Sequence, residues 1–180
     1  MAEDGFTSLK GHFLLAMPGL PDPNFAQTVT CMCEHNDSGA LGFIVNKIHP
    51  LLTGRELFED LNIEFDARVD NLNVYLGGPV QPSGVFVIHG EPFDWEESMN
   101  INPWLSLSNS RDILEAIAVG KGPEQFLIML GCAGWGPYQL DNELSDNAWL
   151  TCPISKEIIF SVDTETKWEK AMMLIGSETS

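Results

Sequence analysis

Residues 130–144, LGCAGWGPYQLDNEL, join an unbroken apolar run to an acidic segment with helical spacing. The apolar run, QFLIML at 125–130, is typical of a strand that is buried on both faces. Three glycines, a tryptophan and a proline follow within seven residues, so we expect the backbone to turn sharply before a helix begins around Leu140. The stretch therefore predicts a strand-to-helix corner and favours a fold that mixes strands with packed helices.

The rest of the chain also alternates between apolar runs and amphipathic stretches. A hairpin is predicted over 25–47, because two strand-like runs flank the turn-rich segment EHNDSG. Further strands are expected at 12–17, 73–80, 84–90 and 156–162, and helices at 53–61, 110–120, 139–150 and 164–176, with Gly176 ending the last helix. The pattern predicts one domain over residues 1–180 with an α/β (mixed α+β) fold, in which helices pack against a largely antiparallel or mixed sheet.

Charge is the strongest global feature of the chain. Asp and Glu number 26 against 9 Lys and Arg, which gives a formal net charge of −17, and the nine cations are scattered along the sequence. Nucleic-acid binding requires a basic patch that neutralises phosphates, so direct binding to DNA or RNA is not expected. An acidic surface of this kind leaves a basic protein partner or a cationic ligand open.

Membrane association is not expected either. An anionic lipid surface would repel the chain, and no apolar run approaches the roughly 20 residues that a membrane-spanning helix needs. The apolar run near the N-terminus is short and follows MAEDG rather than a basic segment, which argues against a signal peptide. We expect a cytoplasmic protein with reduced cysteines.

Cys31, Cys33 and His35 alternate along one strand and would share one face of it. Neighbouring positions on a strand face lie roughly 6.6 Å apart, whereas ligands around one zinc ion lie within about 4 Å of each other. Three residues along a straight strand cannot converge on one ion, so buried structural cysteines are favoured. The acidic segments 56–70 and 91–97 lack EF-hand spacing, and no metal or cofactor is predicted.

The glycine-rich corner could bind a ligand through backbone N–H groups at a helix N-terminus. Its spacing, G-x-x-G-x-G, differs from the dinucleotide fingerprint, and Asp141, Glu143 and Asp146 would repel a phosphate. Three interpretations stay open, with the first favoured: a close-packed structural corner, a site for an uncharged or cationic ligand, or a surface where a protein partner contacts Trp135 and the acids.

Catalysis would need a nucleophile and a base at this corner. Cys132 is the best nucleophile candidate because it lies near a helix N-terminus, but no histidine or basic residue is close in sequence, so an inert thiol is favoured. His35 and His89 lie at expected strand ends, where general bases and metal ligands often occur. A hydrogen-bonded strand terminus is the favoured interpretation of each.

The motifs taken together resemble the AlgH/YqgE family of small bacterial proteins. The resemblance covers residues 11–153 and is carried by GHFLLAMPGLPDPNFAQTVTCMCEHNDSGALGFIVNK, GGPV, VIHG, LGCAGWGPYQLDNEL and NAWLTCP in that order. It implies a single-domain α/β fold in which a bent mixed sheet forms a pseudo-barrel flanked by helices. It also implies a cytosolic bacterial protein without a known cofactor, in a family labelled as transcriptional regulators by association with alginate synthesis.

This chain departs from the family pattern at Cys132, where a tyrosine is usual, and at Tyr138, where a glycine is common. We expect a non-enzymatic regulatory or interaction protein that acts through a protein partner or small ligand. The alternative is an enzyme or small-ligand sensor with a site at the Gly131–Gln139 corner near His35 or His89, which requires these segments to converge on one pocket. The candidate ligand- or partner-binding residues are His35, Asn46, His89, Gly131, Cys132, Gly134, Trp135 and Gln139, and no catalytic residue is assigned.

Overall fold

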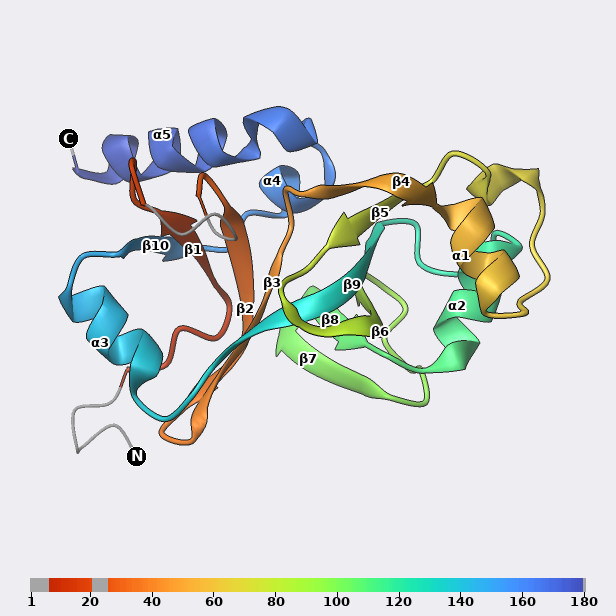
Figure 1. Cartoon of the computed structure of the whole chain (residues 1–180), viewed down its shortest axis with the longest axis horizontal. Helices are drawn as coiled ribbons and strands as arrows, with labels where there is room; N and C mark the ends of the chain where they lie inside the picture. Colours follow the sequence, from red (N-terminus) through yellow and green to blue (C-terminus); the bar gives the residue numbers. More distant parts are fainter. Residues whose placement is uncertain (1–6, 21–25, 180) are drawn as a thin grey trace.

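The computed structural model describes residues 7–20 and 26–179, and its strands form one curled, ten-stranded half-barrel (Figure 1). The strand order is β10-β1-β2-β3-β9-β6-β8-β7, and β4 joins through β5, which pairs with β9. The strands are β1 (His12–Ala16), β2 (Val29–Asn36), β3 (Gly39–Ile44), β4 (Ile48–Thr53), β5 (Asn73–Leu76), β6 (Val80–His89), β7 (Ser98–Asn102), β8 (Leu105–Ser108), β9 (Phe126–Trp135) and β10 (Trp149–Pro153). The helices are α1 (Gly54–Asp60), α2 (Arg111–Ala118), α3 (Gln139–Ser145), α4 (Lys156–Phe160) and α5 (Lys167–Thr179), with short 3₁₀ turns η2 (Ala67–Val69) and η3 (Thr164–Thr166).

Strand β9 holds the two halves of the sheet together. Its first half, Phe126–Leu130, pairs antiparallel with β6 and over 128–130 parallel with β5. Its second half, Ala133–Trp135, pairs antiparallel with β3. Of the strand pairs in the described chain, β5–β9 alone is parallel, so the predicted mixed, largely antiparallel sheet is confirmed.

The change of partner along β9 occurs at Gly131, where three glycine backbones meet. Gly131 has φ +74°, and a β-carbon on it would lie 2.4 Å from the carbonyl oxygen of Gly78. Gly77 donates its N–H to Leu130 O at 2.7 Å and accepts from Ile44 N at 2.8 Å. The GG of GGPV and the first glycine of LGCAGWG therefore allow β3, β5 and β9 to pass each other backbone to backbone.

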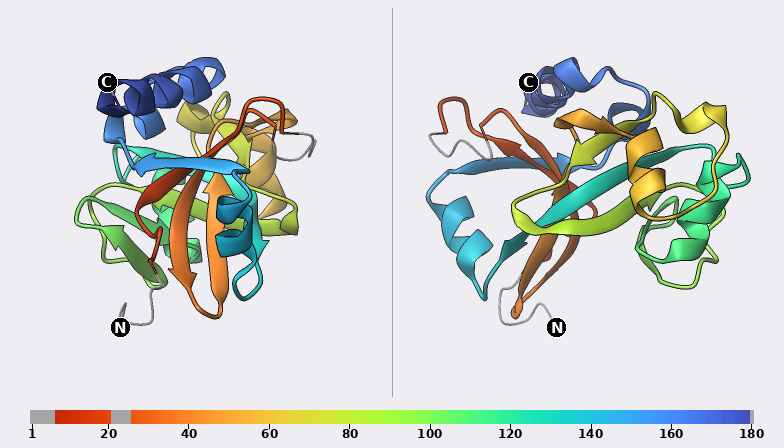
Figure 2. Two further views of the ribbon diagram at one scale, coloured as in Figure 1. Left: turned by 90° about the vertical axis from the view of Figure 1, so that its left-hand side faces the viewer. Right: turned by 45° about the vertical axis from the view of Figure 1, so that its right-hand side comes forward.

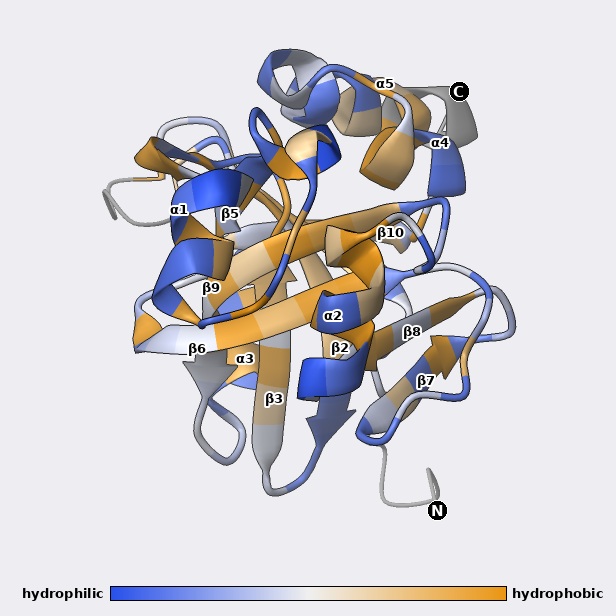
Figure 3. Ribbon diagram, turned by 90° about the vertical axis from the view of Figure 1, so that its right-hand side faces the viewer, coloured by the Kyte–Doolittle hydropathy of each residue, from blue (hydrophilic) through white to orange (hydrophobic). Residues whose placement is uncertain are grey.

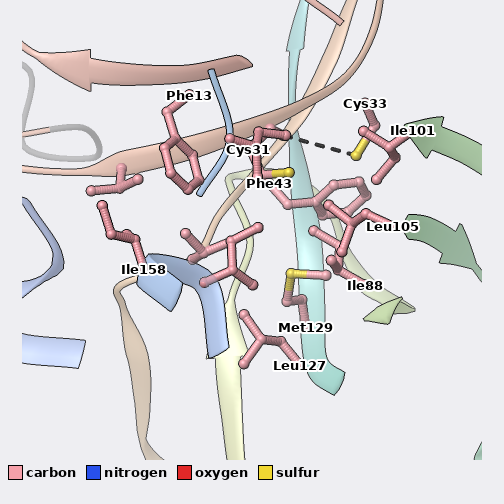
Figure 4. Packing of buried hydrophobic residues seen from close by; sticks show 14 of the residues in the cluster. Phe13, Cys31, Cys33, Phe43, Ile88, Ile101, Leu105, Leu127, Met129 and Ile158 are labelled. Carbon is pink, nitrogen blue, oxygen red and sulfur yellow. Dashed lines mark hydrogen bonds between the residues drawn. The ribbon is translucent and has the colours of Figure 1, made fainter. Parts of the chain in front are cut away.

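The main core lies inside the curl of the sheet. Figure 4 shows Phe13 and Cys31 from β1 and β2 in one cluster with Ile88 and Met129 from β6 and β9, and all four side chains are buried. A second cluster lies between the sheet and helices α1 and α2, where Ile113 and Ile117 pack near Val87 and Ile128. Figure 3 shows the apolar residues along β6 and β9 that this second cluster uses.

The predicted hairpin and most of the predicted helices are confirmed. β2 and β3 form the hairpin around residues 37–38. Thr53 precedes α1, as the capping pattern indicates, and its hydroxyl donates a short hydrogen bond to the Glu56 carboxylate. The apolar stripe of α5, including Trp168 and Met172, packs on the main core.

The prediction of a strand at 156–162 is wrong. This segment forms α4, because the Ser155 hydroxyl accepts a hydrogen bond from Ile158 N at 3.2 Å and caps a helix. Ile158 and Ile159 are both buried, and the sequence period of so short an apolar run does not distinguish a helix from a strand.

Two predicted helix ends are also wrong. α3 stops at Ser145, and Asn147 adopts a left-handed conformation with φ 59°, which asparagine tolerates better than most residues. Trp149 and Leu150, assigned to that helix, instead begin β10, which pairs with β1. α5 continues past Gly176 to Thr179, so Gly176 does not end it.

The chain also contains β4, β7 and β8, which the sequence pattern did not reveal. The break expected between the strands at 73–80 and 84–90 lies inside β6, where the pairing with β9 jumps from Val80↔Cys132 to Val85↔Leu130. β6 therefore has three more residues than β9 over this interval, and they form a bulge that does not pair with β9.

Candidate functional site

The glycine-rich corner begins later than predicted. β9 continues through Gly131, Cys132 and Gly134 to Trp135, and the reversal into α3 uses Gly136–Tyr138. Tyr138 has φ 60° and stands in a left-handed conformation immediately before the helix. The prediction of a corner starting at Gly131 is therefore wrong, because that glycine serves the strand crossing described above.

Glu143 of α3 ties the corner to the sheet. Its Oε1 accepts hydrogen bonds from the indole N–H groups of Trp135 at 3.0 Å and Trp149 at 2.9 Å, while Oε2 accepts from Gln139 Nε2 at 3.1 Å. Gln139 Oε1 in turn accepts from Gly136 N at 3.0 Å. The two indole rings meet edge to face at 6.3 Å, so Trp135 and Gln139 are joined in one compact network.

His35 is the predicted histidine that the fold brings to this corner. Its Nδ1 accepts a hydrogen bond from Leu9 N at 2.9 Å, and its Nε2 lies 3.3 Å from Asp141 Oδ1 of α3. An Nδ1 that accepts must be unprotonated, so the ring proton of neutral His35 sits on Nε2, facing the carboxylate. The bulge in β2 between Met32 and Glu34 places His35 against α3, whereas Cys31 and Cys33 lie in the main core.

His89 lies away from the corner, at the end of β6. It is fully buried, with Nδ1 2.7 Å from Gly90 O and Nε2 2.7 Å from Ser108 Oγ. Because a carbonyl only accepts, Nδ1 carries the proton and Nε2 accepts from Ser108, whose own oxygen lies 2.6 Å from Ser98 Oγ. Burial lowers the pKa of His89, partly opposed by the Gly90 hydrogen bond, and this favours the neutral ring.

The remaining predicted site residues have structural surroundings. Asn46 closes the base of the hairpin, since its Oδ1 accepts from Val29 N at 2.9 Å and its Nδ2 donates to Gln27 O at 3.0 Å. Cys132 is buried, and burial raises the pKa of its thiol. Gly134 lies exposed on β9 with no crowding at its Cβ position.

The cysteines of β2 are interior thiols. Cys31 and Cys33 are fully buried, and burial is the main cause that raises the pKa of Cys33 well above its ordinary value. Within the part of the chain that the structure covers, no group of three or more His, Cys, Asp or Glu side chains is placed to hold a metal ion.

Lys167 is a buried cation that the sequence pattern did not reveal. Its Nζ donates to Val45 O at 3.0 Å and Ile159 O at 2.7 Å, and it lies 5.4 Å from the centre of the Tyr75 ring. No carboxylate among residues 7–20 and 26–175 lies within ion-pair distance of it, and burial lowers its pKa to about 8. Its position at the start of an amphipathic helix gave no sequence signal of burial.

Neither of two cavities that described residues line includes Trp135. One, of about 690 Å³, lies between the 90–93 segment, Trp104, the 124–125 segment and Lys156. The other, of about 270 Å³, lies between η2 and the end of α2. The corner, His35 and His89 therefore do not converge on either of these cavities.

The far end of the half-barrel carries a group of exposed polar side chains that we call the end face. It consists of the hairpin turn 36–39, the turn Gly136–Tyr138 and helix α3, which lie together in Figures 1 and 2. Gly39 and Trp135 are in backbone contact there. Tyr138 is 54% exposed, and Glu34, Asp37 and Asp146 are also exposed.

The nine basic residues all lie in the described part of the chain and are distributed over it. Arg55, Arg68 and Arg111 each form an ion pair with a nearby acid, and Lys167 is buried. The other five lie on different segments: Lys10 before β1, Lys47 after β3, Lys121 after α2, Lys156 on α4 and Lys170 on α5. Among the described helices none is both long and apolar enough to cross a bilayer.

Known proteins resemble this chain over nearly its full length. A family model described as AlgH-like matches residues 13–180. A UPF0301 protein of Desulforapulum autotrophicum is 68% identical over 168 residues, covering 93% of this chain and 89% of the relative. A UPF0301 protein of Pseudomonas paraeruginosa is 44% identical over 182 residues, covering 100% of this chain and 95% of the relative.

Solved structures show the same fold. The solution structure of the AlgH protein from Pseudomonas aeruginosa superposes with a TM-score of 0.84 at 45% identity, covering 94% of this chain and 90% of that one. A crystal structure of a Corynebacterium diphtheriae protein gives a TM-score of 0.72 at 19% identity, covering 93% and 87% of the two chains. The second likeness concerns the fold alone.

Proposed function

The chain belongs to the AlgH-like family, and from that premise we propose that it acts by binding rather than by catalysis, as a non-enzymatic regulatory or interaction protein of the cytosol. One observation carries the proposal. The three residues that the sequence offers as candidates for acid–base or nucleophilic chemistry, His35, His89 and Cys132, are all buried. Both histidine rings contact internal partners through both nitrogens.

The partner that best fits this surface is a protein with a basic segment. The chain carries a net charge of −17, and complementary charge steers encounters and fixes orientation. A polyanion such as DNA is disfavoured by the same charge, because binding it requires clustered cations.

The end face is the proposed contact surface. Trp135 itself is only 7% exposed, so a partner would not contact it directly. Tyr138 is half exposed, and tyrosine is enriched at interfaces because it offers apolar area together with a hydroxyl. The acids Glu34 and Asp37 on the hairpin and Asp146 directly after α3 are also exposed.

The corner network supports binding over catalysis at this place. Glu143 already accepts three side-chain hydrogen bonds, and Gln139 links this network to the turn by accepting from Gly136 N. A rigid, pre-formed loop lowers the entropy cost of association. An enzyme at the same corner would need a base free to take a proton, and His35 is held between Leu9 and Asp141.

A photo-crosslinking amino acid at Tyr138, in the cells that make the protein, tests the proposal. We expect one dominant adduct whose partner presents a basic segment. The same amino acid at the exposed Glu64, remote from the end face in sequence, is the matched control. Adducts of equal yield and identity at both positions, or none at Tyr138, would contradict a partner at the end face.

A further inference from the structure

The larger cavity lies outside the end face and shares no residue with it. Its volume of about 690 Å³ falls within the range of ligand sites. Its lining residues include the aromatic Phe93 and Trp104, the acidic Glu91 and Glu124, the amide residue Gln125 and the basic Lys156. We propose that this cavity binds a small organic cation, such as an alkylammonium group, between the aromatic rings and the carboxylates.

The walls of the cavity are fixed by hydrogen bonds. Gly90 N donates to Gln125 O at 3.0 Å, which joins the end of β6 to the segment before β9. Trp95 Nε1 donates to Pro92 O at 2.8 Å and closes the loop that carries Phe93. Glu96 N donates to Asp112 Oδ2 at 3.0 Å, which anchors the same loop to α2. A cavity held in this way is present before any ligand arrives.

Trp104 differs from the other tryptophans of the chain. Trp95, Trp135, Trp149 and Trp168 each donate the indole N–H to an acceptor in the protein. The indole N–H of Trp104 has no acceptor among the described residues, and this ring lines the cavity. That N–H is open to an acceptor on a ligand, such as a hydroxyl, and tryptophan also offers the strongest cation–π surface of the side chains.

The charges around the cavity select a cation over an anion. Two acidic residues, Glu91 and Glu124, and one basic residue, Lys156, are among its lining residues. The loop that forms one wall also carries Asp94, Glu96 and Glu97 and no basic residue. Lys156 is the one basic residue among these lining residues, whereas a cation could use either carboxylate and the ring of Trp104. Lys156 repels the bound cation. Removing a carboxylate should therefore weaken binding, and removing the charge of Lys156 should strengthen it.

Three compounds of nearly equal shape test the charge preference: choline, the neutral 3,3-dimethylbutan-1-ol and the anion 3,3-dimethylbutanoate. The readout is the indole N–H resonance of Trp104 in a ¹⁵N-labelled sample, assigned by its loss in Trp104→Phe. We expect choline to shift this resonance at millimolar concentrations and to bind roughly fivefold more tightly than the neutral compound.

Two variants that each remove one charge at the cavity, at Glu124 and at Lys156, distinguish binding of a cation from binding of an anion. Both residues are exposed, so we expect both variants to fold. Glu124→Gln should weaken choline binding by up to about fivefold, and Lys156→Gln should strengthen it by a similar factor. Glu64→Gln is the matched control and should leave it unchanged. The proposal is overturned if choline leaves the Trp104 resonance in place, if the neutral compound or the anion binds as tightly, or if Lys156→Gln weakens binding.

Discussion

Gly131 and Gly78 pass each other backbone to backbone, so closely that a β-carbon on Gly131 would lie 2.4 Å from the carbonyl oxygen of Gly78. Gly131 also has φ +74°, a conformation that costs a residue with a side chain roughly 1–2 kcal/mol. The contact explains why the sequence places glycines both at 77–78 and at 131. At this crossing β9 leaves β5 and β6 and joins β3.

Replacing Gly131 by alanine should therefore destabilise the fold by about 2–4 kcal/mol, the sum of backbone strain and overpacking. Gly134→Ala is the matched control three residues along the same strand, where a β-carbon would meet only Val80 Cγ2 at 3.9 Å. We expect it to change stability by less than about 0.5 kcal/mol. Urea unfolding of both variants measures the difference, and equal effects would contradict the crossing as described.

Glu143 should be the most sensitive residue of the end face. Glu143→Ala leaves the N–H groups of Trp135 and Trp149 without their acceptor, which should cost about 2–4 kcal/mol of stability. Glu143→Gln keeps one carbonyl oxygen and should cost less. Chemical denaturation measures both changes, and Asp146→Asn on the same exposed surface should change little. A Glu143→Ala protein as stable as the wild type would show that the network does not hold the corner.

Because Lys167 is buried, it should make the free energy of unfolding increase as pH rises. Burial lowers its folded-state pKa to about 8, below the unfolded value of about 10.4. The unfolded state therefore binds more protons between these values, and this residue makes the protein more stable as pH rises through them. Between about pH 7 and about pH 9.5 the gain is about 2 kcal/mol.

The buried cysteines act in the opposite direction, because burial raises the pKa of Cys33 and Cys132. The contribution of Lys167 is therefore the difference between wild type and Lys167→Met, measured by urea unfolding at both pH values. Wild type should gain more stability than the variant on going to the higher pH. An identical pH dependence in the two proteins would mean that Lys167 titrates normally.

Cys132 should react slowly with thiol reagents in the native state. Its side chain is 2% exposed and burial raises its pKa, so little reactive thiolate is present at neutral pH. We expect iodoacetamide to label all four cysteines in urea and none rapidly in buffer, as measured by mass spectrometry. Fast, selective labelling of Cys132 in the native protein would instead favour an enzymatic role.

The parts of the fold that could be predicted from sequence are those with strong local signals. The Thr53–Glu56 capping pattern and the apolar stripe of α5 gave the positions of two helices because helix geometry places those side chains on one face. The hairpin followed from EHNDSG between two apolar runs. The segment KEIIFSV forms helix α4, although a strand was predicted. In so short a run, a helix and a strand can each bury two adjacent isoleucines, so the sequence does not distinguish them.

The candidate site could be predicted only in part. His35, Trp135 and Gln139 do meet at the corner, but the bulge at Cys33 that aims His35 at α3 leaves no mark in a period-two pattern. His89 lies on another strand, and only the sheet topology separates it from the corner. The cavity beside Gly90 combines four distant segments, so no local spacing could indicate it.

The salt dependence of binding between the purified chain and the partner captured at Tyr138 tests the central claim most directly. A basic segment on an acidic end face should bind more weakly as salt rises, because exposed charges are screened. The Asp37→Asn, Asp146→Asn double variant should bind more weakly still, with a smaller salt dependence. Binding that is independent of salt and unchanged in this variant would contradict recognition through the acidic end face.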